Sequence, residues 1–93
     1  MKEKDVEKYL RERVKAAGGR AYKFISPGND GVPDRVVCLP GGRVFFVETK
    51  APGKETTKLQ DLQINRLLDL GCAVHVLDSK EQVDVFMGRA AGL

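Results

Sequence analysis

The segment PDRVVCLPGGRVFFVETK, residues 33–50, decides the fold of this chain. It holds two nearly continuous apolar runs that a Pro-Gly-Gly turn separates. Short apolar runs bounded by turn-forming residues are typical of β-strands, so the pattern predicts strands over 34–39 and 43–50, joined as an antiparallel hairpin. Because the runs scarcely alternate with polar residues, we expect both strands to be central in their sheet and covered on both faces.

The turn at 40–42 sets the register of the hairpin. Its first two residues are expected in a type I turn and its third, a glycine, in the left-handed conformation. Leu39 then pairs with Arg43, and the same register places Asp34 opposite Glu48. Directly opposed residues have Cβ atoms about 4.5–5.5 Å apart. A slip of one residue would send Asp34 to the other face of the sheet, so the chemistry depends on this register.

Two carboxylates at this separation repel each other unless a cation lies between them. Mg²⁺ favours carboxylate and carbonyl oxygens together with several waters. Asp34, Glu48 and the backbone carbonyl of Thr49 are therefore candidate metal ligands. Lys50 lies on the same strand face as Glu48, where its ammonium would orient or activate an attacking water. The set suits metal-assisted hydrolysis of a phosphodiester, and solvated charges at a strand end are the alternative interpretation.

Helices and strands are expected on both sides of the hairpin, in the order α-β-β-β-α-β-α. Apolar periodicity, capping residues and glycine stops give the expected ranges 2–17, 21–25, 34–39, 43–50, 58–70, 72–77 and 80–87. The first three strands would form an antiparallel meander, and the helix before the fourth strand implies a right-handed crossover to a parallel strand. We therefore predict an α/β fold in one domain, residues 1–93. It has a mixed four-stranded sheet flanked by helices and a short C-terminal helix.

Length and charge limit the function further. The chain has 93 residues and 10.2 kDa, which leaves no room for separate catalytic and regulatory domains. Its formal net charge is +3, but residues 1–58 carry 13 basic and 8 acidic side chains, whereas 59–93 carry 3 basic and 5 acidic ones. A basic excess confined to one part of a small domain favours a polyanionic partner, and chance clustering on a solvated surface is the alternative.

Other sequence signals point away from several classes of protein. Cys38 and Cys72 lack the spacing of a redox pair or a zinc site, so we expect reduced core thiols in a cytoplasmic protein. No apolar stretch predicts a membrane span or a signal peptide. Gly53-Lys54 is not part of a P-loop, because Glu55 follows where Ser or Thr is required, and no nucleotide cofactor is expected.

Aromatic and histidine side chains offer little additional chemistry. Tyr22 and Phe24 recur at strand spacing, which favours a place in the core over stacking on bases. His75 is the only histidine and is expected as a partly exposed residue of the fourth strand.

The wider sequence pattern resembles a known family. The matching strings are GVPDR (31–35), PGG (40–42), FVETKAPG (46–53) and LQ (59–60). They resemble the VRR-NUC family of the PD-(D/E)XK nuclease superfamily, which has the restriction-endonuclease-like fold. This family includes small stand-alone phage and bacterial proteins and the nuclease domain of a DNA-repair endonuclease. The resemblance implies a Mg²⁺- or Mn²⁺-dependent DNA endonuclease specific for branched DNA such as Holliday junctions. A phage-encoded member would act in the host cytoplasm.

The resemblance also implies roles for particular residues. Asp34 and Glu48 would bind the catalytic metal, and Lys50 would serve the attacking water. Gln60 matches a glutamine commonly found near the site. It also completes a capping box with Thr57, and both interpretations of Gln60 stay open.

The first helix is similar to the corresponding helix of archaeal Holliday junction resolvases, which contributes a glutamate to the site. Glu7 is favoured for that role, although Glu3 lies one turn away and an ordinary exposed glutamate is the alternative. Basic side chains near the expected site are candidates for contacts with the DNA backbone. They are Lys23, Arg35, Lys54 and Lys58.

The second helix, residues 58–70, carries leucines on one broad face and a further stripe, Ile64 and Leu68, on another. A second copy of the chain would bury the extra stripe, and a homodimer could cut two strands symmetrically. Packing by the last helix is the alternative. A non-catalytic DNA-binding or interaction module that keeps the nuclease fold is the competing interpretation of the whole chain.

Overall fold

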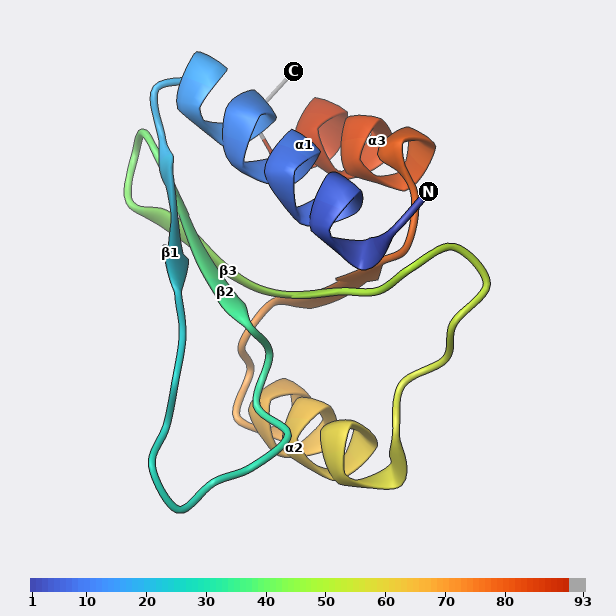
Figure 1. Ribbon diagram of the computed structural model, residues 1–93. Coiled ribbons are helices and arrows are strands. Elements are labelled where there is room, and N and C mark those ends of the chain that lie inside the picture. Colours follow the sequence, from blue (N-terminus) through green and yellow to red (C-terminus); the bar gives the residue numbers. More distant parts are fainter. Residues whose placement is uncertain (91–93) are drawn as a thin grey trace.

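A four-stranded sheet lies at the centre of the molecule, with two helices on one face and one on the other (Figure 1). The computed structural model describes residues 1–90. Its elements are α1 (Glu3–Ala16), β1 (Arg20–Lys23), β2 (Arg35–Leu39), β3 (Arg43–Thr49), α2 (Lys58–Asp69), β4 (Val74–Leu77) and α3 (Lys80–Ala90). Helices α1 and α3 cover one face, and α2 lies on the other (Figure 1). The predicted order of elements is confirmed.

The predicted sheet topology and register are also confirmed. The strand order is β1-β2-β3-β4, antiparallel for the first two pairs and parallel between β3 and β4. Leu39 pairs with Arg43 and Arg35 with Val47, which is the expected register. The turn type was wrong: Gly41 has a φ of +91°, which is typical of the third residue of a type II turn and not of type I.

Three elements differ from the expected ranges by two or more residues at one end, each for a local reason. Strand β4 begins two residues late because the Cys72 N–H donates to the Leu67 carbonyl and completes the end of α2. Strand β1 begins at Arg20 and ends at Lys23, and Ile25 beyond it is 70% exposed. Helix α3 continues to Ala90 because that residue is buried and extends the apolar face by a turn.

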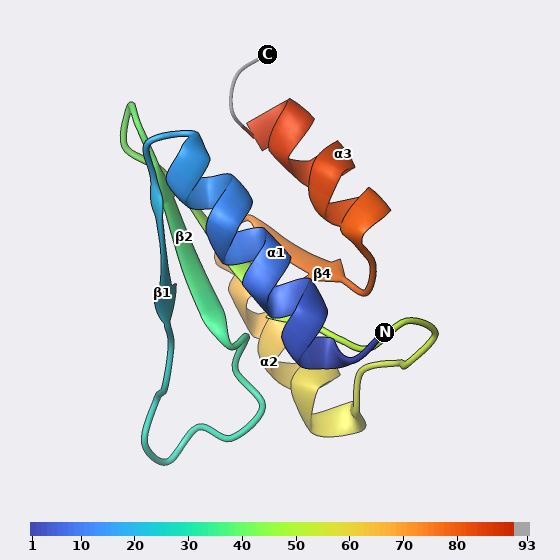
Figure 2. The ribbon, with the colours of Figure 1, turned by 45° about the horizontal axis from the view of Figure 1, so that its top comes forward.

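The main core lies between the sheet and the pair α1 and α3 (Figure 2). Every third or fourth residue of α1 is apolar, so one stripe of the helix is buried against the sheet. The buried apolar side chains are Val6, Leu10, Val14, Val37, Leu39, Val47, Leu77, Val83, Phe86, Met87 and Ala90. Burial of this apolar surface holds the described helices α1 and α3 on the sheet.

The opposite face of the sheet is only partly covered. Gln63 is the one buried residue of α2, whereas Leu68 is 48% exposed. Val44 of β3 and Tyr22 of β1 are 49% and 54% exposed. The expectations that both faces are covered and that Tyr22 lies in the core were therefore wrong. Helix α2, with 12 residues, therefore leaves much of this face exposed.

The alternative interpretation of the α2 stripe required the last helix to pack on α2, and it does not. Helix α3 packs on α1, on the other side of the sheet (Figures 1 and 2). Both cysteines are free and partly exposed, so they are thiols as expected but do not lie in the core. Within residues 1–90, no helix has the length and apolar character needed to cross a membrane.

Gly19, in the turn between α1 and β1, offers a test of how closely these elements pack. A Cβ atom added there would lie 2.8 Å from Leu39 Cδ2 and would overlap the carbonyl oxygen of Cys38. The carbonyl is part of the sheet and cannot move aside. We expect Gly19→Ala to lower the free energy of unfolding by about 1–3 kcal/mol in urea denaturation.

Gly88→Ala is the matched control for this prediction. Gly88 lies within α3, and nothing lies within 4 Å of an added Cβ atom. The substitution should raise stability by about 0.5–1 kcal/mol, because alanine favours the helix. A Gly19→Ala protein as stable as the parent would show that the turn can relax away from β2.

Candidate active site

Asp34 is fixed in place by Thr49, at the point where β2 and β3 reach the same end of the sheet. The Thr49 N–H donates to Asp34 Oδ1 over 3.1 Å, and the Thr49 hydroxyl donates to Oδ2 over 2.9 Å. The N–H groups of Phe46 and Lys50 point toward β4, where they donate to the carbonyls of Ala73 and Leu77. Because successive N–H groups of a strand point to opposite sides, the N–H of Thr49 points toward β2. The Asp34 carboxylate thus takes the place of a backbone carbonyl at the end of the hairpin.

Glu48 is held from the other side by α2. Gln60 Nε2 donates to Glu48 Oε2 over 3.3 Å. The same side chain accepts from the Thr57 N–H over 2.9 Å, while Gln60 N–H donates to the Thr57 hydroxyl over 3.1 Å. Gln60 therefore completes the capping box and contacts Glu48 at once. Both sequence interpretations of Gln60 describe real contacts.

The two carboxylates are electrostatically costly in this position. Glu48 is 5% exposed, and burial, assisted by the nearby charge of Asp34, raises its pKa to about 7. Burial also raises the pKa of Asp34, against the lowering effect of its two bonds from Thr49. Among residues 1–90, the side-chain ion pairs are Arg13–Asp84 and Arg35–Glu7, so neither carboxylate has a cationic partner in contact. A buried acidic pair in this state favours binding of a cation.

The donor set suits a hard divalent cation better than a softer metal. In the described part of the chain, no three His, Cys, Asp or Glu side chains gather as a full ligand cage. Mg²⁺ commonly takes one or two carboxylates and completes its shell with water and substrate oxygens. Lys50, at the end of β3, is half-buried and near enough to Glu48 for its charge to lower the pKa of that carboxyl. Two carboxylates and one ammonium therefore lie together.

The first helix brings two glutamates close to the site. Glu7 forms an ion pair with Arg35, whose side chain is 11% exposed and also donates to the Ala21 carbonyl over 3.2 Å. The charge of Glu7 contributes to the raised pKa of Asp34, and that of the exposed Glu3 to the raised pKa of Glu48. The geometry gives Glu7 a partner that Glu3 lacks, and its catalytic role stays a prediction.

The basic residues expected at the DNA backbone differ in their surroundings. Lys23, Lys54 and Lys58 are exposed, at the end of β1, in the loop after β3 and at the start of α2. Arg35 is instead committed to Glu7 and to the backbone. Contact between Arg35 and DNA stays a prediction that this arrangement does not favour.

Two positioning features were not found from the sequence. The Thr49 hydroxyl was missed because strand alternation assigns it to the opposite face from Asp34. Gly31 has a φ of +92°, and a Cβ atom there would lie 2.7 Å from the Leu59 carbonyl oxygen. This contact seats the loop before Asp34 on α2. The string GVPDR held a signal, since Gly31 precedes a buried proline, Pro33.

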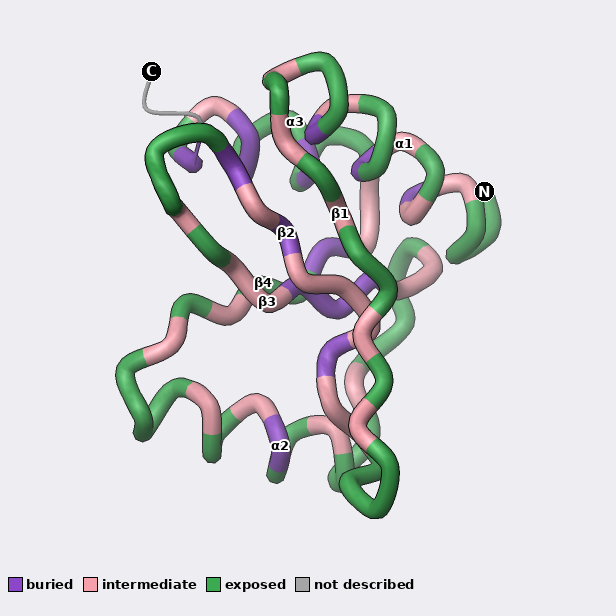
Figure 3. The backbone as a smooth tube through the Cα atoms, turned by 90° about the vertical axis from the view of Figure 1, so that its left-hand side faces the viewer, coloured by how far each residue is buried: buried purple, intermediate pink, exposed green. Residues whose placement is uncertain are grey.

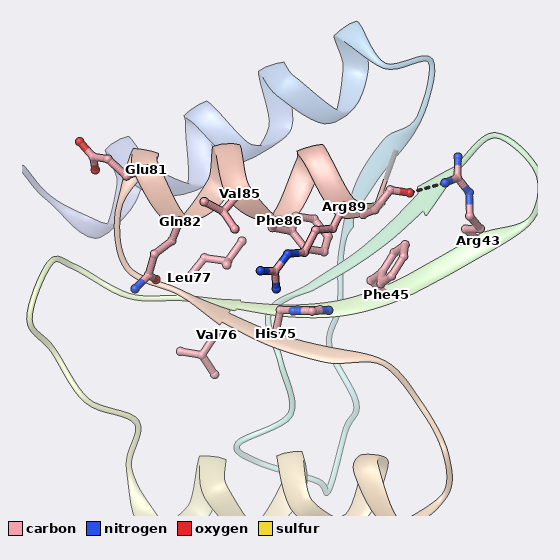
Figure 4. A pocket seen from close by; sticks show the side chains of 11 residues that line it. Arg43, Phe45, His75, Val76, Leu77, Glu81, Gln82, Val85, Phe86 and Arg89 are labelled. Carbon is pink, nitrogen blue, oxygen red and sulfur yellow. Dashed lines mark hydrogen bonds between the residues drawn. The ribbon is translucent and has the colours of Figure 1, made fainter. Parts of the chain in front are cut away.

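A cavity of about 520 Å³ lies away from the acidic pair, between α3 and the edge strand β4 (Figure 4). Phe45, His75 and Phe86 form an aromatic cluster in it, with His75 and Phe86 ring centroids 4.9 Å apart. His75 is exposed as a residue, but its imidazole is partly desolvated. This desolvation, together with the charge of Arg89, lowers its pKa. Glu81 is the one carboxylate in the lining, so the cavity lacks the paired acids of the hairpin end.

The buried charge predicts how stability depends on pH. In the metal-free folded chain the pKa of Glu48 is about 7, against 4.5 in the unfolded chain, so the folded state binds more protons between these values. The free energy of unfolding should therefore fall as pH rises from about 4.5 to 7. Glu48→Gln removes the charge, and we expect it to stabilise the protein at pH 8 by on the order of 1–2 kcal/mol.

Urea denaturation in EDTA at pH 5 and pH 8 would measure this difference. The gain from Glu48→Gln should be smaller at pH 5, where much of Glu48 is protonated. Glu55→Gln, at an exposed loop position, is the control and should change little at either pH. Equal effects of Glu48→Gln at the two pH values would contradict the cause assigned to the raised pKa.

Comparison with known proteins agrees with this geometry. No family model matches the chain. The chain is 51% identical over 81 residues to the protein called "Putative nuclease p44" of Acyrthosiphon pisum secondary endosymbiont phage 1, covering 87% of each. A solved structure described as "VRR_NUC domain" superimposes with a TM-score of 0.87 at 36% identity, covering 92% of this chain and 94% of that one.

The two matches extend over nearly all of the chain, so they include the hairpin, the acidic pair at its end and the flanking helices. They agree with the resemblance already visible in the motif strings, and the mixed sheet with flanking helices is the fold they share. Sequence, fold and relatives thus lead to one conclusion: this chain belongs to the VRR-NUC family of nucleases.

Proposed function

We propose that this nuclease is a Mg²⁺- or Mn²⁺-dependent endodeoxyribonuclease of the PD-(D/E)XK type. The observation that carries the proposal is the pair Asp34 and Glu48, two carboxylates with raised pKa values and no ion-pair partner among residues 1–90. Both side chains, with the backbone carbonyl of Thr49, are the proposed metal ligands. A bound divalent cation would supply Lewis-acid stabilisation of the negative charge that develops on the phosphate.

The neighbouring side chains have separate roles in the proposed reaction. Lys50 orients the attacking water and favours loss of its proton to solvent. The water oxygen forms a bond to phosphorus while the bond to the leaving deoxyribose oxygen breaks. Thr49 holds Asp34 and Gln60 holds Glu48, so both carboxylates are oriented before substrate binds. Such preorganisation is the main contribution a protein makes to phosphoryl-transfer chemistry.

The proposed substrate is branched DNA, with the Holliday junction as the first candidate. The similarity of α1 to the first helix of archaeal Holliday junction resolvases supports this preference. A homodimer would place two copies of the site on one junction, and the exposed leucines of α2, Leu59, Leu62 and Leu68, offer a surface for it. The relative from a phage supports a role in phage DNA repair or processing in the host cytoplasm, where free Cys38 and Cys72 stay reduced.

Cleavage of labelled DNA tests the proposed chemistry. We expect the protein to cut a four-way junction with Mg²⁺ or Mn²⁺ and to stop when EDTA is added. Lys50→Ala should lower the single-turnover rate constant by at least about 100-fold, because the water loses its orientation and the positive charge that favours loss of its proton to solvent. Binding of the uncut junction in EDTA should change little. Lys80→Ala, at an exposed position of α3, is the control.

Two outcomes would contradict the proposal. Absence of metal-dependent cleavage of junction, flap and duplex DNA would favour the competing interpretation, a non-catalytic DNA-binding or interaction module. Full activity of Asp34→Ala would exclude the assigned metal site while leaving a nuclease in place.

The proposed dimer has its own test. Leu68 is 48% exposed and points away from the buried Gln63 side of α2 by helical spacing. Sedimentation at micromolar concentration should give a dimer for the parent chain and a monomer for Leu68→Asp. Val85→Asp places the same charge at a 57% exposed position of α3 and should leave the dimer intact. A monomeric parent chain would rule the dimer out.

A further inference from the structure

A groove of about 490 Å³ lies between α1 and the edge strand β1, and neither Asp34 nor Glu48 is among its lining residues. Its charged lining residues are all basic: Arg11, Lys15, Arg20, Lys23 and Arg35. Figure 3 looks onto this side of the molecule, where β1 is the outermost strand and most of its residues are exposed. Glu7 pairs with one of these cations, Arg35, and the other four make the groove a concentrated positive field on a protein whose net charge is only +3.

The cations of α1 belong to a regular stripe along the helix. Lys4, Lys8, Arg11 and Lys15 follow one another at spacings of four, three and four residues, which places them on one helix face. All four are exposed. The stripe lies away from the buried residues of the helix, so core packing does not require it. Arg11 and Lys15, about 6 Å apart along the axis, bring this stripe into the groove.

Acidic side chains do not neutralise the groove. In the described residues 1–90, Arg11, Lys15, Arg20 and Lys23 take part in no ion pair. Arg35 is paired with Glu7, but its Nε is buried without a hydrogen-bond partner. Like charges gathered in this way destabilise the fold unless an anion offsets them. The groove therefore has the electrostatics of a binding surface for a polyanion.

One end of the groove adjoins the candidate active site. Lys23 pairs with Arg35 across β1 and β2, and the next residue, Phe24, donates its N–H to the Asp34 carbonyl over 2.8 Å. From there the groove extends along β1 to Arg20, whose guanidinium lies over the ring of Tyr22 at 5.8 Å. Tyr22 thereby orients the cation at the far end of the strand.

We infer that this groove binds the sugar–phosphate backbone of one duplex arm of the DNA substrate and leads it to the acidic pair. The inference rests on the proposed function for its substrate class, and it adds Arg11, Lys15 and Arg20 to the residues that contact DNA. Contacts with the sugar–phosphate backbone carry no sequence information directly, so we expect binding in the groove to be independent of sequence. It extends the DNA footprint beyond the residues at the end of the hairpin.

Salt dependence of DNA binding tests the inference without any need for cleavage. Fluorescence anisotropy with a labelled four-way junction and a labelled duplex in EDTA, at 50–300 mM NaCl, would give the slope of log K against log salt concentration. Arg11→Gln/Lys15→Gln removes two phosphate contacts. We expect the magnitude of the slope to fall by about 2 and the affinity near 100 mM salt to fall at least about tenfold. Arg20→Gln alone should lower the slope by about 1.

The matched control is Arg66→Gln/Arg89→Gln, which removes the same charge from exposed residues in the last turns of α2 and α3. It should keep the parent slope. In single-turnover cleavage, the groove variants should need more protein for half-saturation while the maximal rate constant stays within about twofold. This separation is expected of a binding role and not of a catalytic one. Thermal melting would verify that each variant folds, and Arg20→Gln stands in if the double variant does not.

The outcomes separate the groove from the chemistry. Parent-like slopes for both groove variants, in a protein that cleaves DNA, would overturn the groove and leave the proposed nuclease mechanism untouched. A parent chain that binds DNA but never cleaves it would overturn the mechanism, while reduced slopes in the groove variants would still support the groove. A parent chain that binds no DNA would overturn the inference.

Discussion

The bond pair between Asp34 and Thr49 is the constraint on which the site depends. It replaces the last backbone contact of the β2–β3 hairpin with a side-chain contact, so the end of the sheet and the position of the Asp34 carboxylate, a proposed metal ligand, are settled together. The neighbouring Glu48 then faces the space beside α2, where Gln60 reaches it from the first turn of the helix. The loop with Asp34, the end of β3 with Glu48 and Thr49, and the start of α2 with Gln60 are held together by these hydrogen bonds.

In this arrangement the destabilising charge is concentrated on two neighbouring carboxylates, Asp34 and Glu48. A carboxylate that is 5% exposed, next to a second carboxylate, weakens the metal-free fold, and the raised pKa of Glu48 expresses that cost. The apolar contacts of α1 and α3 on the other face of the sheet offset it. The face covered by α1 and α3 therefore supplies most of the stability, and the destabilising Glu48 carboxylate lies beside α2.

The sequence was informative where local rules act alone. The Pro-Gly-Gly turn determined the register, and the register placed Asp34 beside the Glu48 strand end. The capping box located Gln60 for the same reason. Sequence reasoning failed where distant parts of the chain decide: whether α2 is long enough to cover the second sheet face, or whether Asp34 turns toward Thr49. The type of turn was missed because glycine at position 41 permits both signs of φ, and only the strand twist selects one.

The open sheet face and the cationic groove are both surfaces that the core packing does not use. Surface that is not needed for folding remains available for partners, and its chemistry indicates which partner. Exposed apolar side chains on α2 favour contact with a second copy of the chain, because a protein interface would remove these leucines from water. Cations without carboxylate partners along α1 and β1 favour phosphate. Both surfaces flank the acidic pair, so assembly and substrate binding would act on one catalytic centre from two sides.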